Sequence, residues 1–174
     1  MNQEARLSEH LASPSVAALG NLSELDCTRL SPHFTLGELT KTSVKGVDNT
    51  PPHAAVLNLK NLCQDWLEPL REEYNRKYGE VSSLPIVINS GYRSEAVNKA
   101  IGGVAGSNHL TGCAVDIHVD GIEQAIRYAS ILIDISRTLD KEFDELLIEN
   151  KKTFWLHFAV RPSGNRRKVR FIQT

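Results

Sequence analysis

The sequence predicts an α+β fold: one domain in which helices pack on a small, largely antiparallel sheet. Two long segments, residues 53–79 and 122–139, repeat apolar residues at helical spacing. Shorter runs rich in β-branched and aromatic residues lie between and after them, and two of the last runs are separated by a short polar turn, as in a β-hairpin. A length of 174 residues suits one domain with its own core.

The N-terminal part of the chain is expected to divide near residue 31. Residues 1–31 are polar and mixed, so we expect a poorly defined lead-in there and the domain itself over residues 32–174. Inside the domain, Thr35 is placed to cap a short helix that begins at Leu36, with Glu38 as the acid of a capping box. The GVDNTPP segment that follows favours a loop, because Asn and Pro are turn residues.

The helix predicted over residues 53–79 should be kinked or divided at Pro69, which lacks a backbone donor, and should end at Gly79. A buried strand is expected from Ile86 to Asn89. The remaining elements follow in chain order: a short helix over 94–103, a loop over 106–112, a strand over 113–120, a helix over 122–139, a hairpin over 143–160 and an edge strand over 168–172.

Charge and composition exclude several classes of function. The net charge is −1, which gives no overall attraction to nucleic acid. No apolar run approaches the roughly 20 residues that a membrane-spanning helix needs. The three cysteines form no CxxC pair, so neither a disulfide framework nor a thiolate zinc site is indicated. We expect a monomer without a transmembrane segment or nucleic-acid partner, whose basic tail, residues 161–170, is a solvated strand face.

His109, Asp116 and His157 are candidate metal ligands. His109 lies on a glycine-containing loop and Asp116 on the strand that follows, and Gly112 lets loop and strand face one point. His157 lies in an otherwise apolar strand, WLHFAV, where an unpaired imidazole is costly. Taken singly, each residue has a plain alternative: a core histidine with a hydrogen-bond partner, or an aspartate that caps a turn or forms a salt bridge.

Three segments together resemble a known family. SGYRS at 90–94, SNHLTGCAVD at 107–116 and WLH at 155–157 occur in that order. They are similar to the zinc D-alanyl-D-alanine peptidase family, which includes carboxypeptidases and phage endolysins and shares its fold and zinc site with the hedgehog signalling domain. The family pattern S-x-H-x-x-G-x-A-x-D is present at its fixed positions: Ser107, His109, Gly112, Ala114 and Asp116.

The resemblance, which covers about residues 31–160, implies a hedgehog-type fold and one zinc ion per chain, held by His109, Asp116 and His157. It also implies a metallopeptidase that hydrolyses stem peptides of bacterial cell-wall peptidoglycan. Two activities stay open, removal of a terminal D-alanine and endopeptidase cleavage as in endolysins. The alternative is a catalytically inactive zinc-binding module that binds cell wall or a protein partner.

The resemblance also suggests the general base. In some relatives a glutamate stands three positions before the last histidine, but here that position is Phe154. In the hedgehog branch the glutamate ends a strand before the hairpin turn, and Glu149 has that place here. We therefore expect Glu149 to be the base, with Glu145 as the second candidate. Without the resemblance, Glu149 would be an ordinary turn residue.

Four further residues are expected to contact substrate. By resemblance, Arg93 binds substrate and stabilises the carbonyl oxygen during attack, which suits a planar, permanently charged donor; a structural ion pair is the alternative. Ser107 is expected to hydrogen-bond the substrate or to orient the loop, and Trp155 to line the pocket, with a plain core role as its alternative. Strand alternation puts His118 on the same side as Asp116, so we expect it to line the pocket or contact substrate, since a fourth ligand would close the site to water.

Location is predicted from the first fifteen residues, which lack a basic start followed by an apolar stretch. We expect the protein to be cytoplasmic as synthesised and to reach the cell wall through a phage-type pore.

Overall fold

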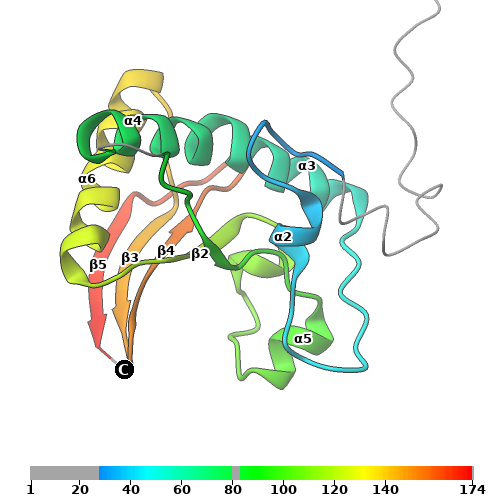
Figure 1. The fold of residues 1–174 in the computed structure, drawn as a ribbon. Helices are drawn as coiled ribbons and strands as arrows, with labels where there is room; N and C mark the ends of the chain where they lie inside the picture. Colours follow the sequence, from blue (N-terminus) through cyan, green and yellow to red (C-terminus); the bar gives the residue numbers. More distant parts are fainter. Residues whose placement is uncertain (1–27, 80–82, 174) are drawn as a thin grey trace, which may run out of the picture.

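The computed structural model describes residues 28–79 and 83–173, and it confirms the α+β class: helices pack on a mostly antiparallel five-stranded sheet (Figure 1). The helices are α2 (Leu36–Thr40), α3 (His53–Leu62), α4 (Glu68–Tyr78), α5 (Glu95–Ala100) and α6 (Ile122–Leu139). The strands are β1 (Ile88–Ser90), β2 (Ala114–His118), β3 (Glu145–Asn150), β4 (Phe154–Ala159) and β5 (Lys168–Gln173), and the sheet order is β1-β2-β4-β3-β5.

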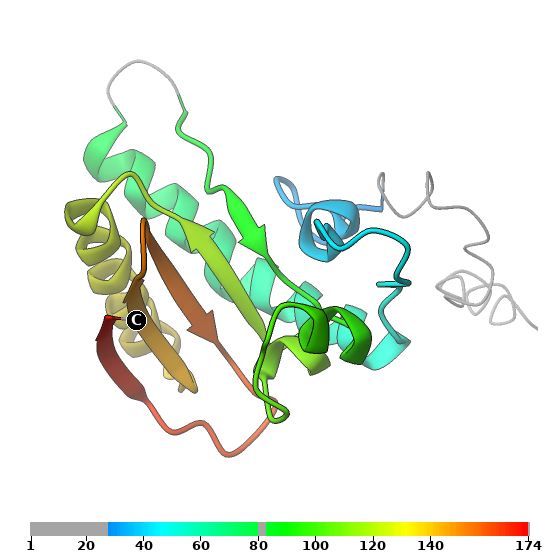
Figure 2. The same ribbon diagram turned by 90° about the horizontal axis from the view of Figure 1, so that it is seen from below.

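The central strands β2, β4 and β3 present two chemically different faces. Alternate side chains of each strand point to the long helices and are buried there: Val115, Ile117, Leu146, Leu156 and Phe158. The side chains between them point the other way: Asp116, His118, Glu145, Leu147, Glu149, Trp155 and His157. Figure 2 looks from the side of this second face, with the long helices behind the sheet. The sequence pattern therefore separates an apolar core face from a polar face.

The first long helix is divided next to Pro69, as predicted. The π-helical turn η2 (Cys63–Leu67) separates α3 from α4, with the Glu68 N–H donating to the Cys63 carbonyl, and Pro69 lies in the first turn of α4. A proline ring clashes with the carbonyl four residues earlier, and the wider π turn gives it room. Trp66 of this turn packs on Phe158, with ring centroids 5.1 Å apart, which fixes the helix against the sheet.

Most other elements agree with their predictions. Thr35 caps α2 and accepts from the Glu38 N–H, while Glu38 accepts a backbone hydrogen bond from Thr35, so the capping box is confirmed. Gly79 ends α4 as expected. The first strand begins later than predicted, at Ile88, although Ile86 is buried.

The C-terminal segment gives an edge strand, as predicted, but a parallel one. After the β3–β4 hairpin the chain passes β3 and β5 pairs with the outer edge of β3, with Glu145 opposite Lys168. The prediction of a poorly defined lead-in falls mainly on residues 1–27, which lie outside the described residues. No helix within residues 28–79 and 83–173 combines the length and apolarity that crossing a membrane requires.

Candidate metal centre

His109 is carried by the 3-10 turn η3 (Asn108–Thr111), which replaces the predicted loop. Ser107 caps the turn by accepting from the His109 N–H, and Gly112 ends it in the left-handed region at φ +70°. A Cβ at Gly112 would lie 2.5 Å from the Ala55 carbonyl oxygen, so the close approach of η3 to α3 requires glycine. The turn thereby brings His109 to the start of β2.

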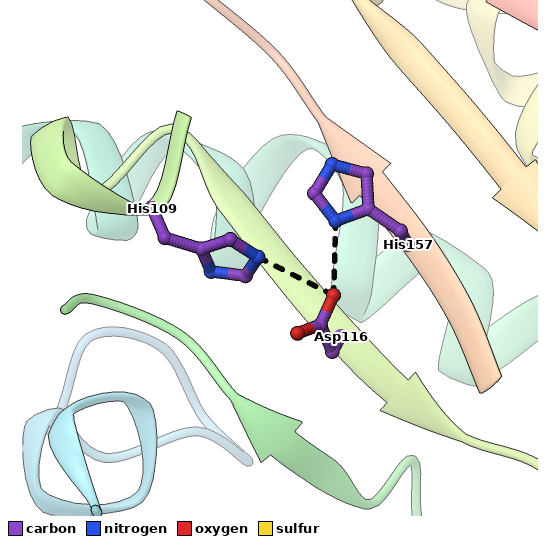
Figure 3. Close-up of side chains that lie close together, drawn as sticks. All are labelled: His109, Asp116 and His157. Atoms are coloured by element: carbon purple, nitrogen blue, oxygen red, sulfur yellow. Dashed lines mark hydrogen bonds and ion pairs between the residues drawn. The ribbon is translucent and has the colours of Figure 1, made fainter. Parts of the chain in front are cut away.

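Asp116 and His157 are direct neighbours in the sheet, because β2 and β4 pair antiparallel with these two residues in register. The Asp116 Oδ1 lies 2.9 Å from His157 Nδ1 and 3.3 Å from His109 Nε2 (Figure 3). All three residues are nearly buried, with exposed fractions of 2% for His109, 9% for Asp116 and 8% for His157. The three predicted ligands therefore meet at one point.

The donor set fits a zinc ion. One ligand atom from each residue lies within 4.8 Å of the other two. The His109 Nδ1–H donates to the Gly91 carbonyl at 2.6 Å, so its Nε2 is left free to face Asp116. Two imidazole nitrogens and one carboxylate oxygen are a common zinc set, and three protein ligands leave a position for water or substrate. Within the described residues, no fourth His, Cys, Asp or Glu joins this group.

Arg93 lies beside the three ligands. Its guanidinium forms an ion pair with the second Asp116 oxygen, and its Nε donates to Ser90 Oγ at 2.8 Å. Its backbone N–H also donates to the His109 carbonyl at 3.1 Å. The structure thus contains the ion pair that sequence reasoning kept as an alternative. Because Arg93 also lines the cleft, a role in substrate binding stays a prediction.

The close packing of charges shifts ionisation at the centre. Burial acts to raise the pKa of Asp116, but His109 and His157 outweigh it and hold this pKa far below its usual value. Burial acts to lower the pKa of His157, whereas the carboxylates of Asp116 and Glu145 raise it to about 9. With no ion bound, the centre therefore favours an ionised aspartate and a protonated His157.

The two candidate bases differ in their surroundings. Burial raises the pKa of Glu149, and His157 lowers it by less. Glu145 instead lies behind His157: its Oε2 is 3.6 Å from Nε2, the ring nitrogen that faces away from Asp116. The His157 imidazole and the Lys168 ammonium hold the pKa of Glu145 far below its usual value. Glu149 is thus the carboxylate whose environment suits proton transfer.

A cleft with a volume of about 480 Å³ opens over the three candidate ligands. Arg93, Ser107, Glu149 and Trp155 line it, as sequence reasoning expected. His118 does not. It is opposite Trp155 in the sheet, but its half-exposed side chain lies 3.3 Å from Asp120 outside the cleft. A substrate contact by His118 stays a prediction without a place in this cleft.

Sequence reasoning missed an ionic network at one end of the cleft. Asp144 is fully buried and accepts from Arg166, in a bidentate pair with both distances 2.8 Å, and from Asn108 at 2.8 Å. Arg161 lies 3.0 Å from the same carboxylate, and Lys168 pairs with Glu145 at 2.9 Å. The expectation of a solvated basic tail therefore holds only in part: Arg161, Arg166 and Lys168 are partly exposed, but each is also paired with a buried or nearly buried carboxylate. The missed signal was Asp144, an acid between a helix and an apolar strand, where burial demands a partner.

Comparison with known proteins bears on this centre. A family model described as Peptidase M15 matches residues 32–152, which is more than half of the chain. The matched part contains His109, Asp116 and Glu149 and ends before His157. No curated protein matches the chain significantly.

Proposed function

Because the chain belongs to the peptidase M15 family, a family of zinc-dependent peptidases, we propose that it hydrolyses a peptide bond in the stem peptides of bacterial peptidoglycan. The observation that carries the proposal is the meeting of His109, Asp116 and His157 at the floor of a cleft. This arrangement supports a metallopeptidase rather than a structural zinc site, because structural sites surround the ion with four protein ligands.

In this proposal His109 Nε2, an Asp116 oxygen and His157 Nδ1 hold one zinc ion per chain. The chemistry that zinc supplies in such enzymes is Lewis-acid catalysis, which activates water and polarises a carbonyl. Glu149 is the general base: it takes the proton of the attacking water and returns it to the leaving amine. Its half-buried place and raised pKa support this role.

The cleft walls supply substrate contacts. The Arg93 guanidinium, 15% exposed, is directed at Asp116 and is proposed to stabilise a developing oxyanion or a substrate carboxylate. Ser107 and Trp155 lie on the cleft wall and are proposed to hydrogen-bond and pack against the peptide. Sequence resemblance supports a bond next to D-alanine. Release of the terminal residue and cleavage inside the stem are the two forms of the activity.

Digestion of purified peptidoglycan tests the proposal. The zinc-loaded protein should release fragments whose masses identify the scissile bond: free D-alanine for a carboxypeptidase, or shortened stem peptides for an endopeptidase. Treatment with a chelator should abolish release and added zinc should restore it. A zinc-loaded protein that binds peptidoglycan and releases nothing would refute the enzyme and leave the zinc-binding module.

A further inference from the structure

A second carboxylate lies against His157 on the side away from Asp116. The Glu145 Oε2 is 3.6 Å from His157 Nε2, an ion-pair distance. Glu145 reaches this place because Leu147 is the register partner of His157, so Glu145 lies two residues along β3 on the same face of the sheet. Its side chain is only 15% exposed.

Glu145 is itself held from the C-terminal segment. Lys168 Nζ and Arg166 Nη2 each lie 2.9 Å from its Oε1. Its Oε2 is left to face His157 and Asn108, whose Nδ2 is 3.4 Å away. The Oε1 atom of Glu145 thus pairs with two cationic side chains, and its Oε2 atom is directed at the His157 imidazole.

Each of the two imidazoles therefore has an acceptor behind the ring nitrogen that faces away from Asp116, 2.6 Å away for His109 and 3.6 Å away for His157. His109 donates through Nδ1 to the Gly91 carbonyl and presents Nε2 to Asp116. His157 presents Nδ1 to Asp116, and its Nε2 faces Glu145. An acceptor behind a ligand histidine fixes its tautomer and its ring orientation, so that the lone pair of the other nitrogen faces the ion.

We propose that Glu145 is a positioning residue of the metal centre: it favours a proton on Nε2 of His157, which leaves Nδ1 free for the ion, and Lys168 and Arg166 hold it there. This deepens the proposed zinc site but does not depend on which bond is cleaved. It also makes β5, beyond the residues matched by the family model, part of the metal centre. In this proposal Glu145 is not the general base.

Zinc affinity, measured by competition with a chelator, tests the proposal. Glu145→Ala should weaken binding about 10–100-fold. Glu145→Gln keeps an acceptor oxygen and should recover part of that loss. Lys168→Met keeps Glu145 but removes one support, and should weaken binding by less than Glu145→Ala. Glu123→Gln, an exposed glutamate of α6 paired with Arg127, is the matched control and should bind zinc like the parent protein.

The imidazole nitrogens supply a second readout that a merely structural role would not move. In ¹⁵N spectra of the zinc-loaded parent, His157 should carry its proton on Nε2 and His109 on Nδ1. In Glu145→Ala, the His157 Nε2 proton should exchange faster with solvent, and the His109 proton should be unchanged.

Unchanged zinc affinity and unchanged exchange in Glu145→Ala would overturn the proposal. If Glu145→Ala fails to fold, Lys168→Met provides the test. Zinc affinity and His157 Nε2 proton exchange equal to those of the parent protein would then overturn the proposal. If zinc binding depends on Glu145 in a protein that releases nothing from peptidoglycan, the positioning role stands and the proposed activity falls.

Discussion

Three carboxylates share the polar face of the sheet, and their neighbours give them different chemistry. Asp116 is shared by two imidazoles and a guanidinium, and Glu145 is held by two cations. Glu149 is half-buried beside the Trp155 indole, with a raised pKa. All three side chains are carboxylates, so burial and neighbouring charges account for the different roles proposed for them: metal ligand, positioning residue and general base.

Glu149→Gln is predicted to keep the zinc ion and lose about 10²–10⁴-fold in kcat, because the amide has the shape of the acid but cannot take a proton. Steady-state kinetics on a peptidoglycan fragment, together with metal analysis of the same sample, measures both quantities. An unchanged kcat would mean that a residue other than Glu149 is the general base.

The raised pKa of His157 predicts a pH dependence of the metal-free protein. Its folded pKa of about 9 lies above the ordinary value of 6.5, so protonation stabilises the fold below pH 6.5 and this stabilisation is lost as the pH rises to 9. The melting temperature of the chelator-treated protein should therefore fall as the pH rises from 6.5 to 9.

At pH 7, zinc binding should release about one proton from His157, which calorimetry in buffers of different ionisation enthalpy detects.

At the scale of elements, the 3-10 turn η3 shows how a backbone constraint positions a side chain. Gly112 has φ +70° and lies against α3, whereas Gly102 has φ +74° and no atom of the described residues within 4 Å of where its Cβ would lie. Both glycines have a positive φ, but only Gly112 has neighbouring atoms at the place where a Cβ would lie. Comparing them separates strain from steric clash.

Gly112→Ala is predicted to destabilise the protein by about 2–5 kcal/mol, since left-handed strain of about 1–2 kcal/mol adds to about 1–3 kcal/mol for the clash with the Ala55 carbonyl. Gly102→Ala should show only the strain. Urea unfolding measures both. Equal losses in the two variants would mean that α3 moves aside at no cost.

Elements were predicted well where local pattern decides. Apolar spacing predicted α6, and Thr35 with Glu38 predicted the start of α2. The π turn was not predictable, because it depends on how Pro69 and Trp66 fit against the sheet. The parallel pairing of β5 with β3 was also missed, since strand direction depends on the path of residues 160–167 and not on alternation within the strand.

At the scale of the whole molecule, the sheet brings together residues that are far apart in sequence. Asp144 connects η3, the turn that carries the candidate ligand His109, through Asn108 to the C-terminal segment through Arg166. The candidate ligands were predictable because their types and order are distinctive. The charged residues around the ligands, such as Glu145 and Lys168, were not predictable. Acidic and basic residues occur throughout the chain, and only the fold determines which of them form pairs.

Arg166→Ala is predicted to destabilise the fold by about 1–3 kcal/mol, because it leaves the buried Asp144 carboxylate short of two hydrogen bonds. Arg137→Ala removes an exposed pair with Asp134, 3.8 Å apart, and should change stability by less than about 1 kcal/mol. Urea unfolding of both variants tests the contrast. Equal effects would mean that Arg161, Asn108 and the backbone N–H of residue 166 satisfy Asp144 without the guanidinium of Arg166.

The Gly91 carbonyl behind His109 has a consequence for how this centre responds to mutation. A main-chain acceptor survives every substitution that keeps the local backbone, whereas the acceptor behind His157 is a side chain that one codon change can replace. Variation in metal selectivity or affinity among descendants of this chain should therefore arise through the β4 histidine, while the η3 histidine keeps its orientation.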